Sequence, residues 1–402
     1  MLSLGLTPIQ LFKYPHPEKE KYSKKKIDII NTSTQENCNK IENGKTYYKK
    51  KTINYGINKY LIDFIKKEDL SSLKCIFNNF DNGMIKILFL FENNLKIFTY
   101  ISENGKDIPE KNISLEDNMN ILNIKPYRNL FVELYENVYL LCRLSNNTLL
   151  LFSEKQKNFI EWPCAITAIE SYTYHHKSMP NTNSDIHINK IFSGDAEGYI
   201  SIIEIITEYK KKKKEFKIIS LSNNYKRSKA HYSLVNGIMY NQRLNIIISS
   251  CEKGYITINN AYSFEFLNVI KIGYNINVID FKLSSYDLLY IYTKEKSNKK
   301  ELFNLYCYTL NGVKISKLIR EKEFANFYIN NTSAYIIDKD GSCKEYNCTN
   351  FKEIENHIKK EEANNITKTG ENVLHCVCNS KLLKIFIIFN KNYKEIKINN
   401  NS

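Results

Sequence analysis

Residues 246–258 read Ile-Ile-Ile-Ser-Ser-Cys-Glu-Lys-Gly-Tyr-Ile-Thr-Ile, two apolar runs separated by a short polar turn. Isoleucine and tyrosine favour the pleated strand, and a glycine tolerates the positive φ that a tight turn requires. The second run alternates along its length, which is typical of a strand with two different faces. This stretch therefore predicts a β-hairpin.

The same pattern occurs six more times along the chain, and hairpin centres recur about every 42 to 55 residues, at residues 87–98, 138–152, 190–202, 288–310, 334–346 and 382–398. That period leaves room for two further strands per unit, as in a four-stranded propeller blade of about 40 to 45 residues. Two stacked β-sandwiches are the rival, but a steady period favours radial repetition. The sequence predicts an all-β fold, a seven-bladed β-propeller with a short N-terminal segment outside it.

Several boundaries follow from composition. Residues 18–45 are polar and rich in lysine, so we expect a flexible linker there and the propeller over residues 46–402. A strand from residues 46–60 is expected to pair with the last blade, because closure removes exposed edges. Helical periodicity is weak, and one short surface helix is expected over residues 351–362.

The charge of the chain indicates little affinity for specific nucleic acid. The 402 residues carry a formal charge of +15, but only five of the 58 basic residues are arginine, the side chain suited to bidentate recognition of phosphate or guanine. Lysine dominates together with 52 asparagines, as A/T-rich codons would produce. Lysine runs at residues 24–26, 210–214 and 294–300 are interpreted as solvated loops; a patch for phosphate or anionic lipid is the alternative. The corresponding alternative function is a basic propeller that binds an anionic membrane surface or nucleic acid. No apolar run approaches the roughly 18 residues of a membrane span, and no secretory signal is visible.

The cysteines and histidines predict neither a metal nor a cofactor. Without a secretory signal, the ten cysteines are expected to be free thiols. One grouping has metal-ligand residue types but lacks paired CxxC spacing: Cys343, Cys348, His375, Cys376 and Cys378. Phosphate-binding, nucleophile-elbow, dinucleotide and zinc-protease motifs are absent from the sequence, so we expect no enzyme. His175 and His176 lie in a polar stretch that is expected to be an exposed loop.

Residues 231–266 resemble a degenerate WD repeat. A histidine, His231, precedes an apolar strand, and the hairpin at residues 246–258 follows. The terminal Trp-Asp of that family is replaced by Asn259-Asn260, and the only tryptophan of the chain is Trp162. The buried Asp/His/Ser/Trp hydrogen-bond network of the family is therefore expected to be incomplete, and His231 to be a loop residue or a structural cap.

The N-terminal residues 5–17 read Gly-Leu-Thr-Pro-Ile-Gln-Leu-Phe-Lys-Tyr-Pro-His-Pro. Three prolines exclude regular helix and strand, so this segment is expected to pack against something else. It resembles the end of the BEACH domain, which closes with a Gly-Gln-Thr-Pro, Gln-Leu-Phe, Pro-His-Pro pattern. Leu6 stands in place of the family's glutamine, and no arginine follows the motif. The matching residues, which we expect to serve in packing or docking, are Gly5, Thr7, Pro8, Gln10, Leu11, Phe12, Pro15, His16 and Pro17.

The resemblance to BEACH proteins, the neurobeachin and beige/lysosomal-trafficking-regulator family, has further implications. Residues 305–315, an apolar strand that ends in Asn-Gly, are similar to a family strand and turn. The family implies the end of a BEACH domain at residues 1–17, followed by a linker and WD repeats. It also implies a non-catalytic scaffold in vesicle trafficking or membrane dynamics, cytoplasmic and peripheral on endomembranes. Its partners would be other proteins at the propeller faces and a BEACH domain in cis or in trans.

The body of the BEACH domain does not precede the motif in this sequence. Met1 is then an internal methionine, the start of a truncated gene model or the start of a separate chain.

Overall fold

The structure is a computed structural model, and the unit that spans Ile53–Ser402 is described by itself. The residues it describes are 59–67, 70, 73–81, 84–91, 94–101, 106–114, 131–135, 138–143, 148–153, 155–161, 165–176, 184–210, 213, 215–221, 226–273, 276–297, 300–330, 332–354, 372–379, 384–389 and 393–397. The N-terminal motif at residues 5–17 and the linker predicted for residues 18–45 lie outside these ranges. Both remain predictions.

The described chain opens with one helix, α1 (Lys59–Lys67), which the sequence analysis did not anticipate. Its apolar residues Leu61, Phe64 and Ile65 are buried and follow helical spacing. The ring of Phe64 packs edge-on against Phe89, with 5.1 Å between the ring centroids. A nine-residue helix shows its period over only two turns, which explains why the pattern escaped notice.

All the other named elements are strands. The first two sheets each hold four antiparallel strands in chain order: β1 (Leu73–Asp81), β2 (Met84–Phe91), β3 (Asn94–Ile101) and β4 (Lys106–Ser114), then β5 (Phe131–Tyr135), β6 (Val138–Arg143), β7 (Thr148–Phe152) and β8 (Lys157–Glu161). The third sheet is larger and holds β9 (Ile166–His176), β10 (Ser184–Asp195), β11 (Tyr199–Lys210), β12 (Glu215–Leu221) and β13 (Lys226–Lys229). In this sheet β12 and β13 pair with different halves of β11.

Two more four-stranded sheets follow: β14 (Val235–Asn241), β15 (Ile246–Cys251), β16 (Tyr255–Asn260) and β17 (Phe266–Lys271), then β18 (Ile276–Leu283), β19 (Leu288–Ser297), β20 (Lys300–Thr309) and β21 (Lys314–Arg320). The last two sheets have three described strands each: β22 (Phe324–Ile329), β23 (Ser333–Asp338) and β24 (Cys343–Asn347), then β25 (His375–Asn379), β26 (Lys384–Ile388) and β27 (Tyr393–Lys397). The described part of the chain thus forms an all-β, propeller-like fold. The last two sheets differ from the others in having three described strands instead of four or more.

The seven hairpins predicted from the sequence are all present as antiparallel pairs, in β2–β3, β6–β7, β10–β11, β15–β16, β19–β20, β23–β24 and β26–β27. In the hairpin that opened the sequence analysis, every residue of β15 is buried, and Gly254 has a φ of 75° in the turn. A positive φ at this place is what favours glycine there. Turn chemistry and strand propensity were therefore sufficient to locate the hairpins.

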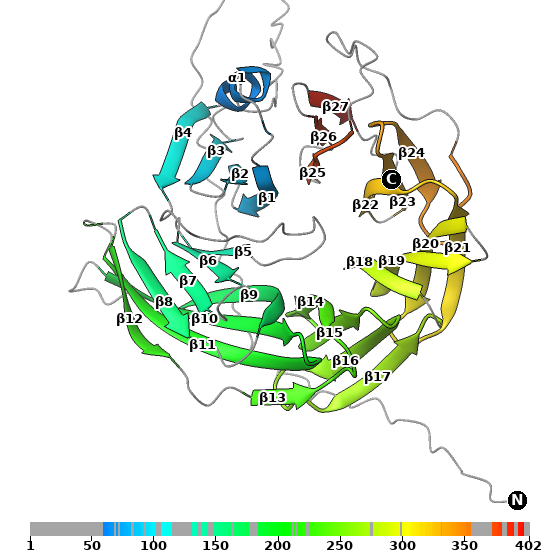
Figure 1. The fold of residues 1–402 in the computed structure, drawn as a ribbon, viewed down its shortest axis with the longest axis horizontal. Coiled ribbons are helices and arrows are strands. Elements are labelled where there is room, and N and C mark those ends of the chain that lie inside the picture. The colour runs from blue at the N-terminus through cyan, green and yellow to red at the C-terminus, as the bar shows by residue number, and fades with distance from the viewer. Residues whose placement is uncertain are drawn as a thin grey trace, which may run out of the picture. The chain divides into compact units, whose positions relative to one another are not determined.

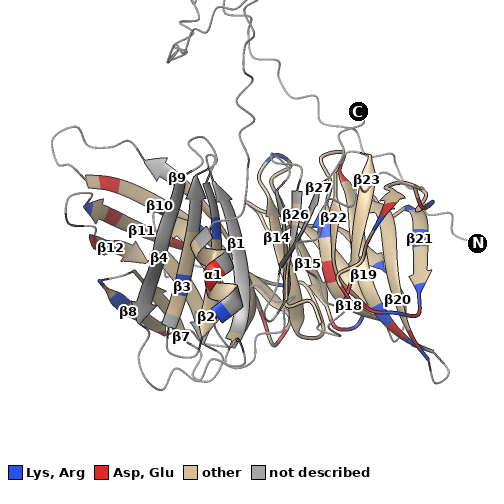
Figure 2. Ribbon diagram, turned by 90° about the horizontal axis from the view of Figure 1, so that it is seen from above, with Lys and Arg blue, Asp and Glu red and all other residues tan. Residues whose placement is uncertain are grey.

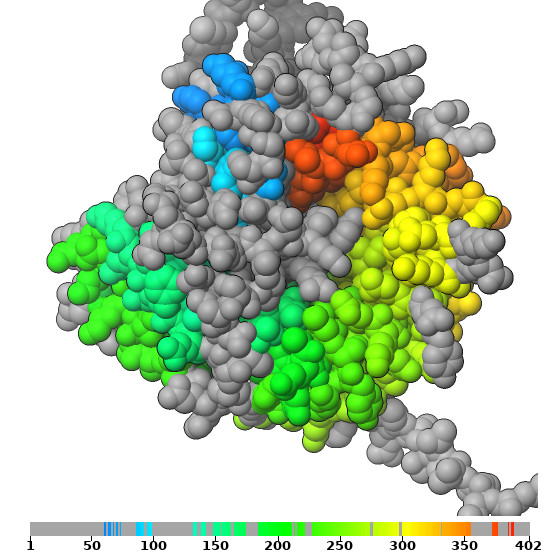
Figure 3. Space-filling view, in the orientation of Figure 1, coloured from blue at the N-terminus to red at the C-terminus, as the bar shows by residue number. Residues whose placement is uncertain are grey.

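The sheets pack side by side in chain order, with the first strand of each sheet toward the centre and the later strands toward the periphery (Figure 1). One apolar cluster joins the first three sheets, and separate clusters join the third to the fourth, the fourth to the fifth, the fifth to the sixth and the sixth to the seventh. Ile388 of β26 belongs to the same cluster as α1 and the first sheet. The space-filling view accordingly shows orange-red atoms near the blue ones (Figure 3). This arrangement differs from two stacked β-sandwiches.

Close approach between neighbouring sheets depends on a glycine at one contact. A Cβ atom placed on Gly194 of β10 would lie 2.3 Å from Cγ1 of Val235 on β14. Since real Cβ atoms do not approach that closely, any larger residue would push the third and fourth sheets apart.

Three local predictions need correction or lie outside the described residues. His175 and His176 do not form a loop, because they end strand β9 and pair with β10. Residues 351–354 are not helical; Glu353 forms an isolated bridge with Tyr346, and the rest of the predicted helix is not described. Closure was expected through a strand at residues 46–60, but Lys59 and Tyr60 begin helix α1, and the earlier residues are not described.

Candidate functional site

The inner strands of successive sheets are joined by side chains that donate hydrogen bonds to the neighbouring backbone. We call these bonds the inner belt. Thr173 Oγ1 on β9 donates to the carbonyl of Leu134 on β5 at 2.8 Å. Thr167 Oγ1, also on β9, donates to Val235 O on β14 at 2.5 Å. These carbonyls belong to edge strands, which in the described sheets have no neighbouring strand of the same sheet on that side. A side chain therefore supplies the hydrogen bond that a neighbouring strand would otherwise donate.

The inner belt continues through the next three strands. Asn236 Nδ2 on β14 donates to Val278 O on β18 at 2.6 Å. Lys282 Nζ on β18 donates to Phe327 O on β22, and Tyr328 Oη on β22 donates to Cys376 O on β25. Five side chains therefore connect six consecutive inner strands, and they fix the walls of the space between them.

A register shift repeats along these strands and sets which side chains point inward. In β9, β14, β18 and β22 one residue has no partner in the adjacent strand, namely Thr167, Asn236, Ile279 and Ala325. Such bulges bend a strand and re-aim the side chains that follow. In each of these strands, the second residue after the bulge is buried and apolar. The third residue after the bulge is Glu170, Met239, Lys282 or Tyr328.

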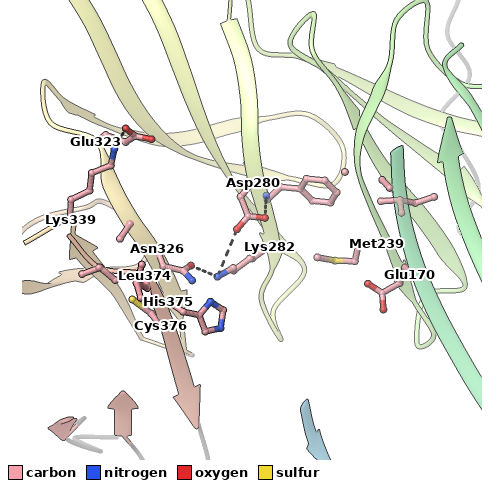
Figure 4. A pocket seen from close by; sticks show the side chains of 16 residues that line it. Glu170, Met239, Asp280, Lys282, Glu323, Asn326, Lys339, Leu374, His375 and Cys376 are labelled. Atoms are coloured by element: carbon pink, nitrogen blue, oxygen red, sulfur yellow. Dashed lines mark hydrogen bonds and ion pairs between the residues drawn. The ribbon is translucent and has the colours of Figure 1, made fainter. Parts of the chain in front are cut away.

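These inner strands surround a cavity of about 530 Å³, which we call the central cavity (Figure 4). Its size lies in the range of small-ligand sites in proteins. Residues from β9, β14, β18, β22 and β25 line it, together with Glu323 before β22, Lys339 after β23, and Val373 and Leu374 before β25. Its charged and titratable side chains are Glu170, Asp280, Lys282, Glu323, Lys339, His375 and Cys376.

Most of these charged groups are already paired. Lys282 Nζ lies 3.9 Å from Asp280 Oδ2, donates to Asn326 Oδ1 at 3.0 Å, and sits 4.5 Å from the centroid of the Phe327 ring. Glu323 forms an ion pair with Lys339. Figure 4 shows these pairs on one side of the cavity and Glu170 with Met239 on the other.

Burial shifts the titration of the cavity side chains. Desolvation raises the pKa of Glu170 to about 7, although the backbone N–H of Ser171 opposes this by hydrogen bonding to the carboxylate. Desolvation also raises the pKa of Asp280, against the charge of Lys282 and the N–H of Phe281. The pKa of His375 falls to about 4, first from desolvation and then from the charge of Lys282, so its imidazole is neutral near pH 7.

A second polar cluster is buried at His231, between the third and fourth sheets. His231 Nε2 lies 2.9 Å from Ser249 Oγ, which in turn lies 2.8 Å from Thr257 Oγ1. Desolvation lowers the pKa of His231 to about 4. Within the described residues Nδ1 of His231 has no hydrogen-bond partner, and Asn259 instead donates to Phe264 O. His231, expected to be a loop residue or a structural cap, lies in the connection between β13 and β14 and joins Ser249 and Thr257 in this cluster.

The cysteines behave as apolar residues. Cys343 and Cys376 pack in one apolar cluster and Cys348 in another, and burial raises the pKa of the Cys376 thiol above its usual range. Cys251, Cys307, Cys343, Cys348 and Cys376 are free thiols. Among the residues that the structure describes, no group of histidine, cysteine or carboxylate side chains is placed to hold a metal ion.

Other predicted features lie elsewhere. The motif residues Gly5, Thr7, Pro8, Gln10, Leu11, Phe12, Pro15, His16 and Pro17 are outside the described residues. In the described ranges, no helix has the length and hydropathy of a membrane span. Described charges of both signs are spread over the sheets in Figure 2, with neither sign gathered on one side in that view.

The fold and the cavity together define a class: an all-β, propeller-like protein with a polar central cavity. No family of known proteins matches the sequence, and no curated protein matches it either.

Two solved structures are similar in fold. A chain in the crystal structure of a mitotic checkpoint complex has a TM-score of 0.50 and 10% identity, over 90% of this chain and 100% of that chain. The computationally designed Ika8 protein has a TM-score of 0.46 and 11% identity, over 83% of this chain and 98% of that chain. At 10% identity, the similarity to the checkpoint-complex chain concerns the fold alone.

Proposed function

We propose that the chain is a non-catalytic protein-interaction scaffold built on a closed, seven-bladed β-propeller. The order of the sheets supports seven blades, since each is joined to the next by a shared apolar cluster. The position of Ile388 beside α1 and the first sheet supports closure. Closure leaves only peripheral strand edges open, and these are where partners can add.

One observation carries the scaffold function: two neighbouring outer strands expose large apolar side chains. Phe266 and Leu267 on β17 are 59% and 51% exposed, and Val269 is exposed beside them. Val313, directly before β21, and Ile315, within it, are exposed too. Strand β17 lies against the turn that leads into β21, because Asn268 Nδ2 donates to the carbonyl of Leu310 in that turn at 2.9 Å. We call these five residues the outer apolar patch.

The occupant of the outer apolar patch is an extended apolar segment of a partner protein. In the described part of the chain β17 pairs only with β16, so its other edge offers unpaired backbone groups. Edge strands normally carry charges that prevent strand addition, whereas Phe266–Ile270 carry none. An added strand gains main-chain hydrogen bonds from the edge and specificity from the side chains.

The experiment compares the full wild-type chain with Val269→Lys. Partners are recovered from cells that express the chain, then purified and titrated against it by calorimetry. We expect a 1:1 complex that Val269→Lys weakens at least tenfold, and that Ile219→Lys, a control on outer strand β12, leaves unchanged. A complex that tolerates Val269→Lys, or failure to reconstitute any complex, contradicts the proposal.

The cellular role is a second part of the proposal: a place beside a BEACH domain, in cis or in trans, on the cytoplasmic side of endomembranes in vesicle trafficking. Its support is the match of residues 5–17 to the end of that domain. A purified BEACH domain that lacks its own C-terminal motif should bind the chain, and Leu11→Ala with Phe12→Ala should abolish that binding. Equal binding by the double variant argues against this role.

Binding to an anionic membrane is the competing outcome, motivated by the charge of +15. Liposomes with anionic lipid should retain the chain only weakly at about 150 mM salt if the scaffold function holds, because screening removes exposed charge interactions. Strong retention at that salt concentration would favour the membrane function instead.

A further inference from the structure

The central cavity contains more acceptor capacity than its own cations can use. Three carboxylates line it, Glu170, Asp280 and Glu323, against the two ammonium groups of Lys282 and Lys339. Glu323 is neutralised by Lys339. The remaining cation, Lys282, divides its donors between Asn326 and Phe327 O on β22, and reaches Asp280 only at 3.9 Å.

Glu170 is the carboxylate with the least compensation. Among the described residues it interacts with the backbone N–H of Ser171, and no described cationic side chain lies within ion-pair distance of it. Burying a carboxylate without a cation is costly, and proteins normally supply a partner. Because the described residues supply none here, we expect the partner to be an external cation.

The cavity also offers a place for an aliphatic stem. Met239 lies beside Glu170 (Figure 4). Ala168, Ile238 and Phe281 also line the cavity, and all three are buried. Apolar walls with a few convergent polar groups are typical of ligand pockets. About 530 Å³ is sufficient for a side chain of lysine or arginine size together with adjacent atoms.

We propose that the central cavity binds an organic cation, an ammonium or guanidinium group on an aliphatic stem, through the carboxylate of Glu170. The stem lies against Met239 and Phe281. A guanidinium suits a carboxylate site well, since its planar fork can donate two parallel hydrogen bonds to one carboxylate. The inference goes beyond the proposed scaffold function, because it needs no partner at the outer apolar patch.

The test titrates the full chain at pH 8 with n-butylguanidinium and with its neutral analogue n-butylurea. We expect saturable millimolar binding of the cation only. Glu170→Gln, which keeps the shape and removes the charge, should weaken binding at least tenfold, and Glu170→Asp should retain part of it. Glu265→Gln, an exposed glutamate outside the cavity, is the matched control and should leave the affinity unchanged.

A pH series distinguishes the carboxylate from other groups. Since the pKa of Glu170 is about 7, affinity should fall about tenfold from pH 8 to pH 6 as that carboxyl becomes protonated. The other titratable groups that line the cavity are Asp280, Lys282, Glu323, Lys339, His375 and Cys376, whose pKa burial raises. His375, with a pKa of about 4, stays neutral throughout. The pH effect should persist in Asp280→Asn and vanish in Glu170→Gln.

The source of the cation is assigned by comparing an acetyl-Gly-Arg-Gly-amide peptide with agmatine. Tighter binding of the peptide assigns the site to an arginine of a partner polypeptide, and binding of agmatine alone assigns it to a free organic cation; either supports the cation site. Equal affinity for n-butylurea, unchanged affinity in Glu170→Gln, or no saturable binding of any cation overturns the proposal. None of these outcomes depends on the outer apolar patch, so failure here leaves the scaffold proposal standing.

Discussion

The inner strands of these sheets carry polar side chains that bond to neighbouring sheets, whereas outer strand β17 exposes apolar side chains to solvent. Inner strands β9, β14, β18 and β22 carry threonine, asparagine, lysine and tyrosine, which donate to neighbouring backbones and line a cavity. Outer strand β17 instead exposes phenylalanine, leucine and valine. Polar residues gather at the centre because several edge strands converge there and their backbone groups need partners. At the periphery each edge faces solvent alone.

The difference predicts which changes the fold tolerates. A side chain on an inner strand belongs to a packed or hydrogen-bonded set, so its loss affects two sheets. A side chain of the outer apolar patch contacts little, so its loss affects binding and leaves stability nearly unchanged.

The largest expected effect contrasts two phenylalanines. Phe324 on inner strand β22 is fully buried and stacks on Tyr292 with 3.7 Å between centroids, whereas Phe266 on β17 is exposed. Phe324→Ala should lower the free energy of unfolding by about 3–5 kcal/mol, and Phe266→Ala by less than about 0.5 kcal/mol. Urea denaturation followed by circular dichroism measures both. Similar losses for the two variants would end the distinction between inner and outer strands.

The next effect concerns the uncompensated carboxylate of the central cavity. Because the pKa of Glu170 rises to about 7 on folding, the folded state holds its proton more tightly than the unfolded state between about pH 4.5 and 7. The stability this confers is complete below the lower value and is lost as pH rises through the higher one.

Glu170→Gln removes that dependence. At pH 8 it should raise the free energy of unfolding by at most about 3 kcal/mol, and at pH 4 by almost nothing, since a pKa difference of one corresponds to about 1.4 kcal/mol. Denaturation at both pH values, with Glu265→Gln as the exposed control, measures the difference. A Glu170→Gln variant that is no more stable than wild type at pH 8 would show that another group of the protein stabilises the charged Glu170 carboxylate.

A smaller loss is expected from cutting one bond of the inner belt. Thr167→Val keeps the shape of the side chain but leaves the carbonyl of Val235 without its donor. We expect a loss of about 1–3 kcal/mol in the free energy of unfolding, the penalty of an unsatisfied buried group. Thermal and urea unfolding measure this loss. Thr349→Val, the same substitution in an exposed turn, is the control. Equal losses in the free energy of unfolding for the two threonine variants would show that the inner belt does not contribute to stability.

Sequence reasoning located the hairpins because each depends on local chemistry: β-branched and aromatic runs on either side of residues such as Gly254. It did not locate α1, whose nine residues show the helical period over only about two turns. It also did not predict that His175 and His176 extend strand β9. Strand β9 continues through these histidines because β10 is long enough to pair with them. The length of β10 cannot be read from the histidines themselves.

The central cavity could not be predicted by inspecting single motifs, because its members lie over two hundred positions apart and meet only when the sheets converge. A signal was nevertheless present. Four windows align at the bulges: Thr167–Glu170, Asn236–Met239, Ile279–Lys282 and Ala325–Tyr328, each with a buried apolar third residue. Aligning the repeats on that apolar residue would have placed Glu170, Met239, Lys282 and Tyr328 at one level of the inner surface.

The smallest effect on stability is expected on the outer strands themselves, where β17 and β21 also differ. β21 carries Lys314, Lys317 and Arg320, whereas Phe266–Ile270 of β17 are uncharged. Leu267→Lys should change the free energy of unfolding by less than about 0.5 kcal/mol, because Leu267 is half exposed. It should also reduce self-association at high protein concentration, since a lysine on an edge strand opposes pairing between molecules. Ile319→Lys on the already basic β21 should change self-association much less. Sedimentation velocity over a concentration series measures the comparison, and equal self-association by the wild type and both variants would show that β17 is not the adhesive edge.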